Sequence, residues 1–470
     1  MAKPTGASEH RGSIGPRGAH LRPGFGMGGY LPDILPSHHW RLSSLDRDQT
    51  FMLEAMRESM RAFGRTSPNP AVGCVVVKAD RIVARGFTSP PGGPHAERQA
   101  HQALELAPNL REDLQNNGGW PEGADVYVTL EPCSFHGRTP ACTDLFQGAR
   151  NLRVVVGCRD PHPRVAGEGL RLLGSYGLHL ELGVLGNEIA ATLLPFTRDV
   201  ISADGKVSEG QSDRPFVALK WAQSIDGAMA DHAGKSQWLT GALAGRYTHW
   251  LRQKYDALAV GWSTLVADRP LLNVRQVPAG CEPRHPVRVV FDPRDRMSSL
   301  SASERVDMFA RGGGAASGGG TWVVFGARTV PLLKDASTPS EDGLTDDLEL
   351  TYLGDSLGTR ILWLKVPGDH EHGTWLKDCL AWLASAQGEA CLDRRIQSLM
   401  VEGGPRLQGI FWSAGLCDAL HGWVSPLLLG HSAYTWLGRH QTDLIDARRL
   451  RLIQALPVGD DVLCEWVAQE

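Results

Sequence analysis

Residues 131–142 read EPCSFHGRTPAC and place two cysteines, Cys133 and Cys142, nine positions apart. Upstream, His95-Ala96-Glu97 opens a run whose alanines recur at helical spacing. One imidazole and two thiolates are three soft ligands for a tetrahedral zinc ion, and they leave a fourth position open for water. An open position is typical of a catalytic zinc site rather than a structural one. The pattern therefore predicts a zinc-dependent enzyme with His95, Cys133 and Cys142 as metal ligands.

Glu97 lies two positions after the predicted histidine ligand. Two residues correspond to roughly 200° around a helix, so Glu97 is poorly placed to bind the metal itself. It can still reach a water held by zinc, whose pKa the metal lowers to about 7. We predict that Glu97 is the catalytic general acid and base that carries protons from water to leaving ammonia. Zinc-dependent deaminases of nucleobase rings use this ligand set and a glutamate in this role. Their second cysteine usually follows in a Cys-x-x-Cys motif, whereas eight residues separate the two cysteines here.

Two other functions stay open at this point. A structural zinc module in a nucleotide-sensing or scaffold protein needs a fourth protein ligand, and His136, inside the 131–142 loop, is the first residue to test. A nucleic-acid base deaminase with an accessory binding domain needs a basic, aromatic-rich stripe. The chain has 48 Lys and Arg against 52 Asp and Glu, a net charge of −4, and its sequence shows no such stripe. Taken singly, each residue of the zinc pattern is also compatible with an ordinary core or helix-cap role.

Length and composition indicate a folded protein of two or three domains. The chain has 470 residues, of which 42% are hydrophobic and 21% charged, as in ordinary globular proteins. Nine thinly spread cysteines, an odd number, indicate a reducing compartment rather than a disulfide scaffold. No window approaches ~20 consecutive apolar residues, and the start of the chain lacks the apolar segment of a secretory signal. We expect a cytoplasmic protein without a membrane partner, while the basic, Gly-rich start leaves organelle import open.

Helical and strand patterns alternate in the first half of the chain. Ser44 or Asp46 can cap a helix with a stripe of methionines, and Pro94 is expected to be the first residue of a second helix. The remaining expected elements are a hairpin over 71–77 and 81–87, strands over 125–130, 152–157 and 178–184, and short helices over 140–148 and 169–174. This order predicts a three-layer α/β domain.

A polar stretch then marks a linker before a second α/β domain. The predicted divisions are a disordered Gly/Pro-rich tail over 1–45, a zinc domain over 46–195, a linker over 196–214 and the second domain over 215–470. Strands of the second domain are expected at 216–221, 257–260, 287–291, 322–325 and 398–401. Two Gly-rich or polar tracts, 312–320 and 336–347, are expected to be surface insertions because they show no periodicity.

Three segments of the first domain narrow the interpretation further. Together with 131–142, residues 68–74 (PNPAVGC) and 160–167 (DPHPRVAG) closely resemble the deaminase half of the bifunctional riboflavin-biosynthesis deaminase/reductase family. The resemblance implies hydrolytic deamination of 2,5-diamino-6-(5-phosphoribosylamino)pyrimidin-4-one, with Asn69 and Arg138 as substrate-binding residues. Independently of the resemblance, Arg138 lies in the sequence between two predicted metal ligands, and its guanidinium group can bind a phosphate through two hydrogen bonds. Thr88 stands where the family commonly has a substrate-contacting histidine, which puts one ring contact in doubt.

The second domain contains motifs of its own. Residues 401–407 read VEGGPRL, and two glycines at a strand end followed by a helix suit phosphate binding by backbone N–H groups. This is not the G-x-G-x-x-G dinucleotide fingerprint. Residues 220–227 (KWAQSIDG) and 264–275 (TLVADRPLLNVR) carry further polar groups.

In order and spacing these segments resemble the reductase half of the same family, whose fold is similar to dihydrofolate reductase and which uses NADPH to reduce the ribosyl side chain to ribityl. By this resemblance the cofactor-binding residues are Ala222, Trp238, Thr264, Asp268, Gly404, Pro405, Arg406 and Leu407. The substrate-binding residues are Ser236, Arg252, Leu272, Arg275 and Glu402. Arg269 departs from the family by replacing the second acid of an Asp-Asp-Pro motif. Lys220 and Asp226 are candidates for orienting the ring or supplying charge.

The combined prediction is a bifunctional zinc deaminase and NADPH-dependent reductase. Its fold class is α/β, with a cytidine-deaminase-like domain followed by a dihydrofolate-reductase-like domain. We expect Zn²⁺ and NADPH as cofactors, a small phosphoribosyl pyrimidine as substrate, no nucleic-acid partner and a homo-oligomer.

Overall fold

The structure is a computed structural model of the chain. It describes residues 45–67, 69–162, 165–196, 213–236, 239–277, 283–310, 320–326, 348–353, 359–365, 374–430, 435–437 and 447–468. Trp238, nearly all of the predicted tail and linker, and the two predicted insertions except Gly320 lie outside these ranges. Among the helices of the described ranges, none combines the length and the apolar character that a membrane crossing requires.

A five-stranded sheet forms the centre of the first domain. In sheet order its strands are β2 (Arg81–Phe87), β1 (Gly73–Lys78), β3 (Asp125–Leu130), β4 (Arg153–Cys158) and β5 (His179–Leu182). β1 pairs antiparallel with both β2 and β3, and β3, β4 and β5 run parallel. The predicted hairpin and the three later strands are confirmed within a few residues.

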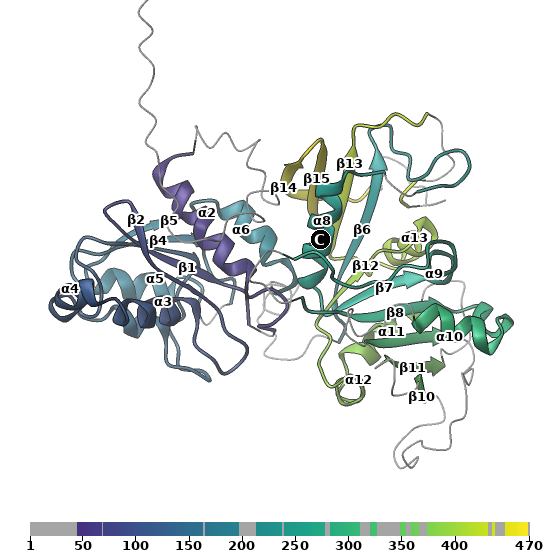
Figure 1. The fold of residues 1–470 in the computed structure, drawn as a ribbon, viewed down its shortest axis with the longest axis horizontal. Helices are drawn as coiled ribbons and strands as arrows, with labels where there is room; N and C mark the ends of the chain where they lie inside the picture. The colour runs from purple at the N-terminus through teal and green to yellow at the C-terminus, as the bar shows by residue number, and fades with distance from the viewer. Residues whose placement is uncertain are drawn as a thin grey trace, which may run out of the picture.

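Helices cover both faces of this sheet, so the predicted three layers are confirmed. α2 (Arg47–Met60) and α6 (Gly186–Thr192) lie on one face, and α3 (Ala96–Glu105) and α5 (Glu168–Ser175) lie on the other (Figure 1). Three shorter elements are the 3-10 helix η1 (Pro108–Leu110), α4 (Arg111–Asn116) and the 3-10 helix η2 (Cys142–Phe146). The helix expected over 140–148 is thus a single short 3-10 segment.

Of the two predicted cap residues, Asp46 is the N-cap of α2, and Ser44 lies outside the described residues. Asp46 accepts a hydrogen bond from the Gln49 backbone N–H at 2.8 Å, and the Gln49 side chain accepts one from the Asp46 N–H at 3.2 Å. This reciprocal pair satisfies two backbone donors that the first helical turn leaves without partners. The methionine stripe Met52, Met56 and Met60 is buried in the core.

The expected start of α3 at Pro94 is wrong, because the helix begins two residues later at Ala96. His95 is the N-cap residue and has extended backbone angles, φ −73° and ψ 169°. The angle of roughly 200° assumed between His95 and Glu97 therefore does not apply, since only Glu97 belongs to the helix. The extended backbone leaves the His95 side chain outside the row of helical side chains.

A larger sheet organises the second domain. In sheet order its ten described strands are β10 (Leu348–Leu353), β11 (Thr359–Lys365), β9 (Thr321–Gly326), β8 (Val287–Asp292), β7 (Ala257–Gly261), β12 (Ser398–Val401), β6 (Phe216–Ser224), β13 (Ala419–Ser425), β15 (Asp461–Ala468) and β14 (Leu450–Val458). The strands from β11 to β13 are parallel, and antiparallel neighbours close both edges. All five expected strands are present, while the sequence reading did not identify the remaining five.

Helices of the second domain also cover both faces of its sheet (Figure 1). They are α8 (Ala242–Gln253), α9 (Trp262–Asp268), the 3-10 helix η3 (Arg296–Ser299), α10 (Ala302–Ala310), α11 (Thr374–Ala384), α12 (Ala386–Leu392) and α13 (Pro405–Ser413). Each face of the sheet has its own cluster of buried apolar side chains.

The two domains share part of one of these cores. Met60, Phe63 and Leu194 of the first domain belong to the same buried cluster as residues of α8 and β7. The rings of Phe63 and Trp250 lie 4.9 Å apart, and Lys254 donates a hydrogen bond to the backbone carbonyl of Ala191 at 2.9 Å. Because apolar burial stabilises the docked arrangement, the first domain is held against α8 of the second.

Candidate active sites

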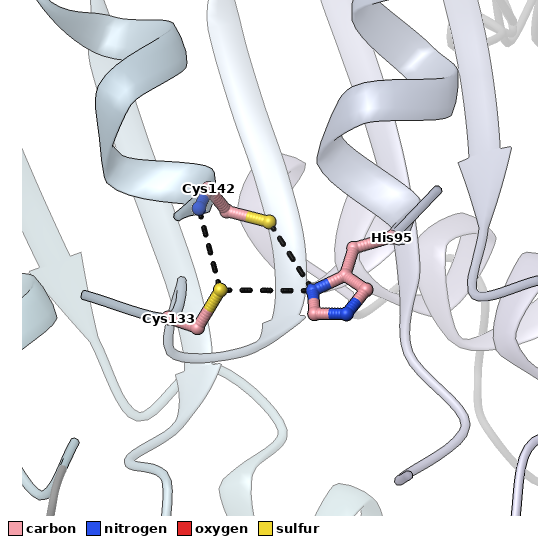
Figure 2. Close-up of side chains that lie close together, drawn as sticks. All are labelled: His95, Cys133 and Cys142. Atoms are coloured by element: carbon pink, nitrogen blue, oxygen red, sulfur yellow. Dashed lines mark hydrogen bonds between the residues drawn. The ribbon is translucent and has the colours of Figure 1, made fainter. Parts of the chain in front are cut away.

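Three metal-binding side chains converge in the first domain. The His95 Nδ1 atom lies 3.6 Å from Cys133 Sγ and 3.4 Å from Cys142 Sγ (Figure 2). The three ligand atoms all lie within 4.8 Å of one another. The residues come from three separate places: the N-cap of α3, the loop after β3 and the first residue of η2. Folding thus brings together residues that are up to 47 positions apart in the sequence.

The side chains of His95, Cys133 and Cys142 are chemically suited to bind zinc. The backbone N–H of Cys142 donates to Cys133 Sγ at 3.3 Å, and such a donor stabilises a thiolate. The pKa of Cys133 is lowered to about 4, first by the hydrogen bond with the Cys142 side chain and further by His95 and the Cys142 amide. A thiolate and an imidazole are the ligands that zinc prefers. His95, Cys133 and Cys142 are therefore suited to hold the ion.

Glu97 lies beside this cluster and is nearly completely buried, with 3% of its surface exposed. Burial, opposed in part by a hydrogen bond with the Cys142 side chain, raises its pKa to about 7. A carboxyl group with such a pKa exchanges protons readily at neutral pH, which suits a general acid and base.

A cavity of about 330 Å³ opens beside the cluster. His95, Glu97 and Cys133 line it, and so do Asn69 and Thr88, both singled out in the sequence. The Thr88 hydroxyl accepts a hydrogen bond from the Val72 backbone N–H at 3.1 Å, so it is part of the cavity wall. Arg138 is different, because it is exposed on the 131–142 loop and is not among the described residues that line the cavity.

His136 is not a fourth metal ligand. Its side chain is 70% exposed, and its Nε2 atom lies 3.1 Å from a carboxylate oxygen of Asp144. Among the described residues, the ligand group around His95 contains only the two cysteines besides the histidine. This arrangement does not support a structural zinc module with four protein ligands.

The sequence analysis missed two buried acids of this site. Asp160 lines the cavity, and burial raises its pKa to about 7. Glu131 accepts hydrogen bonds from three backbone N–H groups, those of Asp160 at 3.2 Å, Gly167 at 3.0 Å and Leu170 at 3.1 Å. It thereby ties the loop that carries Asp160 to the end of β3. Asp160 is the first residue of the DPHPRVAG segment, so the sequence draws attention to it. Its burial in the cavity wall, however, depends on the fold.

The second site lies where parallel strands of the larger sheet end. Glu402 directly follows β12, and its carboxylate accepts two hydrogen bonds from Arg252 of α8, at 2.7 and 2.8 Å. Val401 pairs with Leu219, so Lys220 lies beside Glu402 on the neighbouring strand. Desolvation raises the pKa of Glu402, whose side chain is 10% exposed, but the charges of Arg252 and then Lys220 outweigh it and lower the pKa to about 2. The carboxyl ends of parallel strands are the usual place for ligands in α/β sheets.

Positive charge exceeds negative charge around Glu402. His249 contacts Arg275 at 3.3 Å, and the Arg252 side chain donates to the Asn273 carbonyl at 3.0 Å. The pKa of His249 is lowered to about 4 by burial and then by the two arginines, so this histidine is neutral at pH 7. Lys220 and Arg252 lie beside the Glu402 carboxylate, and Arg275 lies next to His249, so cations outnumber carboxylates here. This excess suits an anionic ligand such as a phosphate.

The predicted phosphate-binding helix start is present at α13. The Gly404 N–H donates to the Thr264 hydroxyl at 3.0 Å, and Pro405 has no N–H, so fewer backbone donors face outward than the motif suggested. Arg406 is exposed in the first turn, whereas the Leu407 side chain is buried in the core.

The remaining predicted residues of the second domain are more scattered. Asp268 ends α9 and has a pKa raised by partial burial, and Ala222 is half-buried on β6. Ser236 is exposed. Leu272 is 1% exposed within the core, so a contact with substrate would come from its backbone. Asp226 accepts hydrogen bonds from the backbone N–H groups of 429 and 430, which holds that loop in place.

Two family models match the chain. Residues 45–158 match the cytidine and deoxycytidylate deaminase zinc-binding region. Residues 215–317 and 390–464 match the RibD C-terminal domain.

Full-length relatives decide the family. The riboflavin biosynthesis protein RibD of Actinobacillus pleuropneumoniae is 32% identical over 435 residues, which cover 92% of this chain and 98% of the relative. RibD of Escherichia coli is 32% identical over 433 residues, with coverage of 90% and 99%. The chain belongs to the RibD family. Both halves of RibD proteins are therefore present in one polypeptide.

Solved structures of the RibD family agree with this assignment. The diaminohydroxyphosphoribosylaminopyrimidine deaminase/5-amino-6-(5-phosphoribosylamino)uracil reductase of Thermotoga maritima is 29% identical, with a TM-score of 0.57 and coverage of 90% of this chain and 99% of that one. Acinetobacter baumannii RibD is 28% identical, with a TM-score of 0.56 and the same coverage. The predicted fold class, a cytidine-deaminase-like domain followed by a reductase domain of the dihydrofolate-reductase type, is confirmed.

Proposed function

We propose that this chain catalyses two consecutive steps of riboflavin biosynthesis. The first domain hydrolytically deaminates 2,5-diamino-6-(5-phosphoribosylamino)pyrimidin-4-one, and the second reduces the ribosyl side chain of the product to ribityl with NADPH. Membership of the RibD family supports a bifunctional deaminase and reductase. The single observation that carries the first activity is the convergence of His95, Cys133 and Cys142 beside buried Glu97, next to a cavity that His95, Glu97 and Cys133 line.

In the deaminase site, His95, Cys133 and Cys142 would hold zinc, which supplies Lewis acidity that makes water more acidic. Glu97 accepts a proton from the attacking water and donates a proton to the departing amino group. The ring carbon gains a bond to oxygen and loses its bond to nitrogen, and ammonia leaves. Asn69, which lines the cavity, and Arg138, which is exposed on the 131–142 loop, would bind the substrate.

In the reductase site, the excess of cations around Glu402 would bind the substrate phosphate. Arg252 and Arg275 are the proposed phosphate ligands, and the Glu402 carboxylate keeps Arg252 in place through two hydrogen bonds. The cofactor would lie along the ends of β6, β7 and β12, with Ala222, Thr264, Asp268 and the first turn of α13 as its contacts. NADPH supplies the hydride when bound. Trp238, a further proposed cofactor contact, lies outside the described residues.

The substrate of such an enzyme is a small molecule. The cavity beside the zinc ligands has a volume typical of small-ligand sites. A single-stranded nucleic acid would need a long basic groove with stacking aromatics, and the net charge of −4 does not favour one. A homo-oligomer and a cytoplasmic location stay predictions.

Separate assays of the two activities test the proposal. Purified protein is given the aminated pyrimidine phosphate with and without NADPH, and ammonia release and NADPH oxidation are measured independently. Removal of zinc by a chelator should abolish ammonia release, while reduction of the deaminated product, supplied directly, should continue. Ammonia release that persists in verified zinc-free protein would overturn the metal assignment. A failure of both activities with replete zinc and NADPH would overturn the proposed function.

A further inference from the structure

One residue of the reductase domain lines the deaminase cavity. Gln397, directly before β12, forms part of the wall of the cavity that contains His95, Glu97 and Cys133. All the other described residues of that wall lie between 69 and 196, in or at the end of the first domain. The deaminase cavity is thus completed across the domain boundary.

Gln397 lies at the end of the cavity remote from the metal ligands. Four residues of the wall, Asn69, Pro70, Phe196 and Gln397, also line a smaller cavity of about 70 Å³ between the two domains. The three residues at the reaction centre line only the larger cavity. A substrate with its leaving amino group at Glu97 would therefore extend its non-reacting portion toward Gln397.

Hydrogen bonds of its backbone and its side chain hold Gln397 in place. Its backbone N–H donates to the Asp256 carboxylate at 3.0 Å, and its carbonyl accepts from the Phe216 N–H at 2.8 Å. The Ser67 hydroxyl donates to its side-chain oxygen across the domain boundary. A side chain held in this way loses little conformational entropy when it contacts a ligand.

The charges beyond Gln397 suit an anionic substrate end. Lys254 and Arg284 line the smaller cavity together with one acid, Asp256. Arg284 contacts Asp256 at 2.9 Å, and Lys254 donates to the Ala191 carbonyl, which leaves one cation in excess. The interdomain end of the cavity is therefore polar and slightly positive.

We propose that Gln397 is a substrate-binding residue of the deaminase, supplied by the reductase domain, and that it contacts the phosphoribosyl portion of the pyrimidine substrate. This inference rests on the proposed function of the first domain. It makes substrate selection by the deaminase dependent on docking of the second domain. Gln397 directly precedes β12 and Glu402 directly follows it, so the two residues lie at opposite ends of the strand.

The test measures deaminase kinetics of full-length, zinc-replete Gln397→Ala and Gln397→Glu proteins. Loss of one neutral hydrogen bond should raise KM for the phosphoribosylated substrate roughly 2- to 10-fold with kcat nearly unchanged. Gln397→Glu should raise KM further, because a carboxylate repels the substrate phosphate. An analogue that lacks the phosphoribosyl group should react equally with the wild-type and Gln397→Ala proteins. Reductase kcat and KM should not change in either variant.

Two further variants distinguish a substrate-binding role of Gln397 from a purely structural one. Ser67→Ala removes the interdomain hydrogen bond but keeps the Gln397 amide in the cavity, so its KM should stay near wild type. Gln387→Ala, which changes an exposed glutamine of α12, is the matched control. An unchanged KM in Gln397→Ala, or equal effects on the substrate and the truncated analogue, would overturn the inference. A wild-type protein that releases no ammonia would instead count against the proposed function.

Discussion

At the scale of single residues, His95 shows how a backbone conformation decides the use of a side chain. As the N-cap of α3 it is extended, and its imidazole reaches the two cysteines rather than the helix surface. Glu97, two residues later, is helical and buried beside them. Two side chains that are only two positions apart in sequence thus occupy different places in the site.

Glu97→Gln should abolish most deamination without loss of the metal. The amide keeps the shape of the side chain but cannot carry a proton, so kcat should fall by about 10² to 10⁴. Ammonia release, zinc content by atomic absorption and NADPH-dependent reduction should be measured on the same preparation. Glu105→Gln, an exposed change on the same helix, is the control. Near-normal ammonia release in the Glu97 variant would rule out its proposed role.

His249 should make the stability of the protein depend on pH. In the folded protein its pKa is lowered to about 4, whereas an unfolded imidazole titrates near 6.5. Between these values the unfolded chain binds more protons, so stability should fall as the pH drops from about 6.5 toward 4. Two half-buried histidines, His101 and His285, also have pKa values lowered by burial and act in the same direction.

The measurement is the midpoint of thermal unfolding at a series of pH values. His249→Gln should flatten the dependence in this range, because one of the contributing imidazoles is gone. The exposed His179→Gln variant should keep the wild-type slope. If the slope in His249→Gln equals that of the wild type, the lowered pKa of His249 is not the cause.

At the scale of elements, the packing of α3 on β2 positions the deaminase chemistry. Gly86 of β2 lies so close to the helix that an added Cβ would overlap the Ala96 carbonyl oxygen and lie 2.5 Å from Ala100 N. Such a close approach is possible only without a side chain. Because α3 begins directly after His95 and contains Glu97, this contact fixes the distance of both residues from the cysteines.

Gly86→Ala should therefore damage the zinc site selectively. Displacement of α3 should cost about 1–3 kcal/mol in stability and lower both zinc affinity and ammonia release. Reduction by the second domain should change little. Gly174→Ala, in α5, meets only a side-chain carbon at 3.8 Å and should be neutral or slightly stabilising. Equal zinc affinity in wild type and Gly86→Ala would show that α3 need not lie this close.

At the scale of the whole molecule, the two domains are joined by more than a linker. Phe63 and Leu194 pack into the reductase core, and Gln397 of the reductase domain lines the deaminase cavity. At Gly64, which has φ +73°, the backbone of the first domain lies close to the second domain. A Cβ at this position would overlap the Gln253 carbonyl oxygen of the other domain and lie 3.0 Å from Arg284 Cδ.

Gly64→Ala should loosen the docking of the two domains. The substitution combines an unfavourable backbone conformation with steric overlap, so unfolding should begin at a lower temperature and separate into two transitions. Differential scanning calorimetry would show this. Gly245→Ala, in α8 with open space around it, is the control. A single transition at the wild-type temperature would show that the interface tolerates a side chain at Gly64.

Much of this protein is determined by local sequence. The H-x-E and P-C-x8-C motifs predict zinc chemistry because ligand types alone select the metal, and alternating strand and helix patterns predict two α/β domains. Short, regular elements such as β3 follow from residue preferences that act within a few positions. The resemblance of these motifs to a family further predicted the pair of activities.

Only the tertiary structure decides the relations between distant residues. That His136 pairs with Asp144, that Leu272 is buried in the core, and that Asp160 lines the cavity depends on the three-dimensional arrangement of the chain. Strands β10, β11, β13, β14 and β15, which lie toward the two ends of the larger sheet, were missed because strand pairing is stabilised by neighbours far away in sequence. Gln397 reaches the deaminase cavity for the same reason, since the docking of two hydrophobic surfaces brings residues from separate domains together, and no local pattern records that contact.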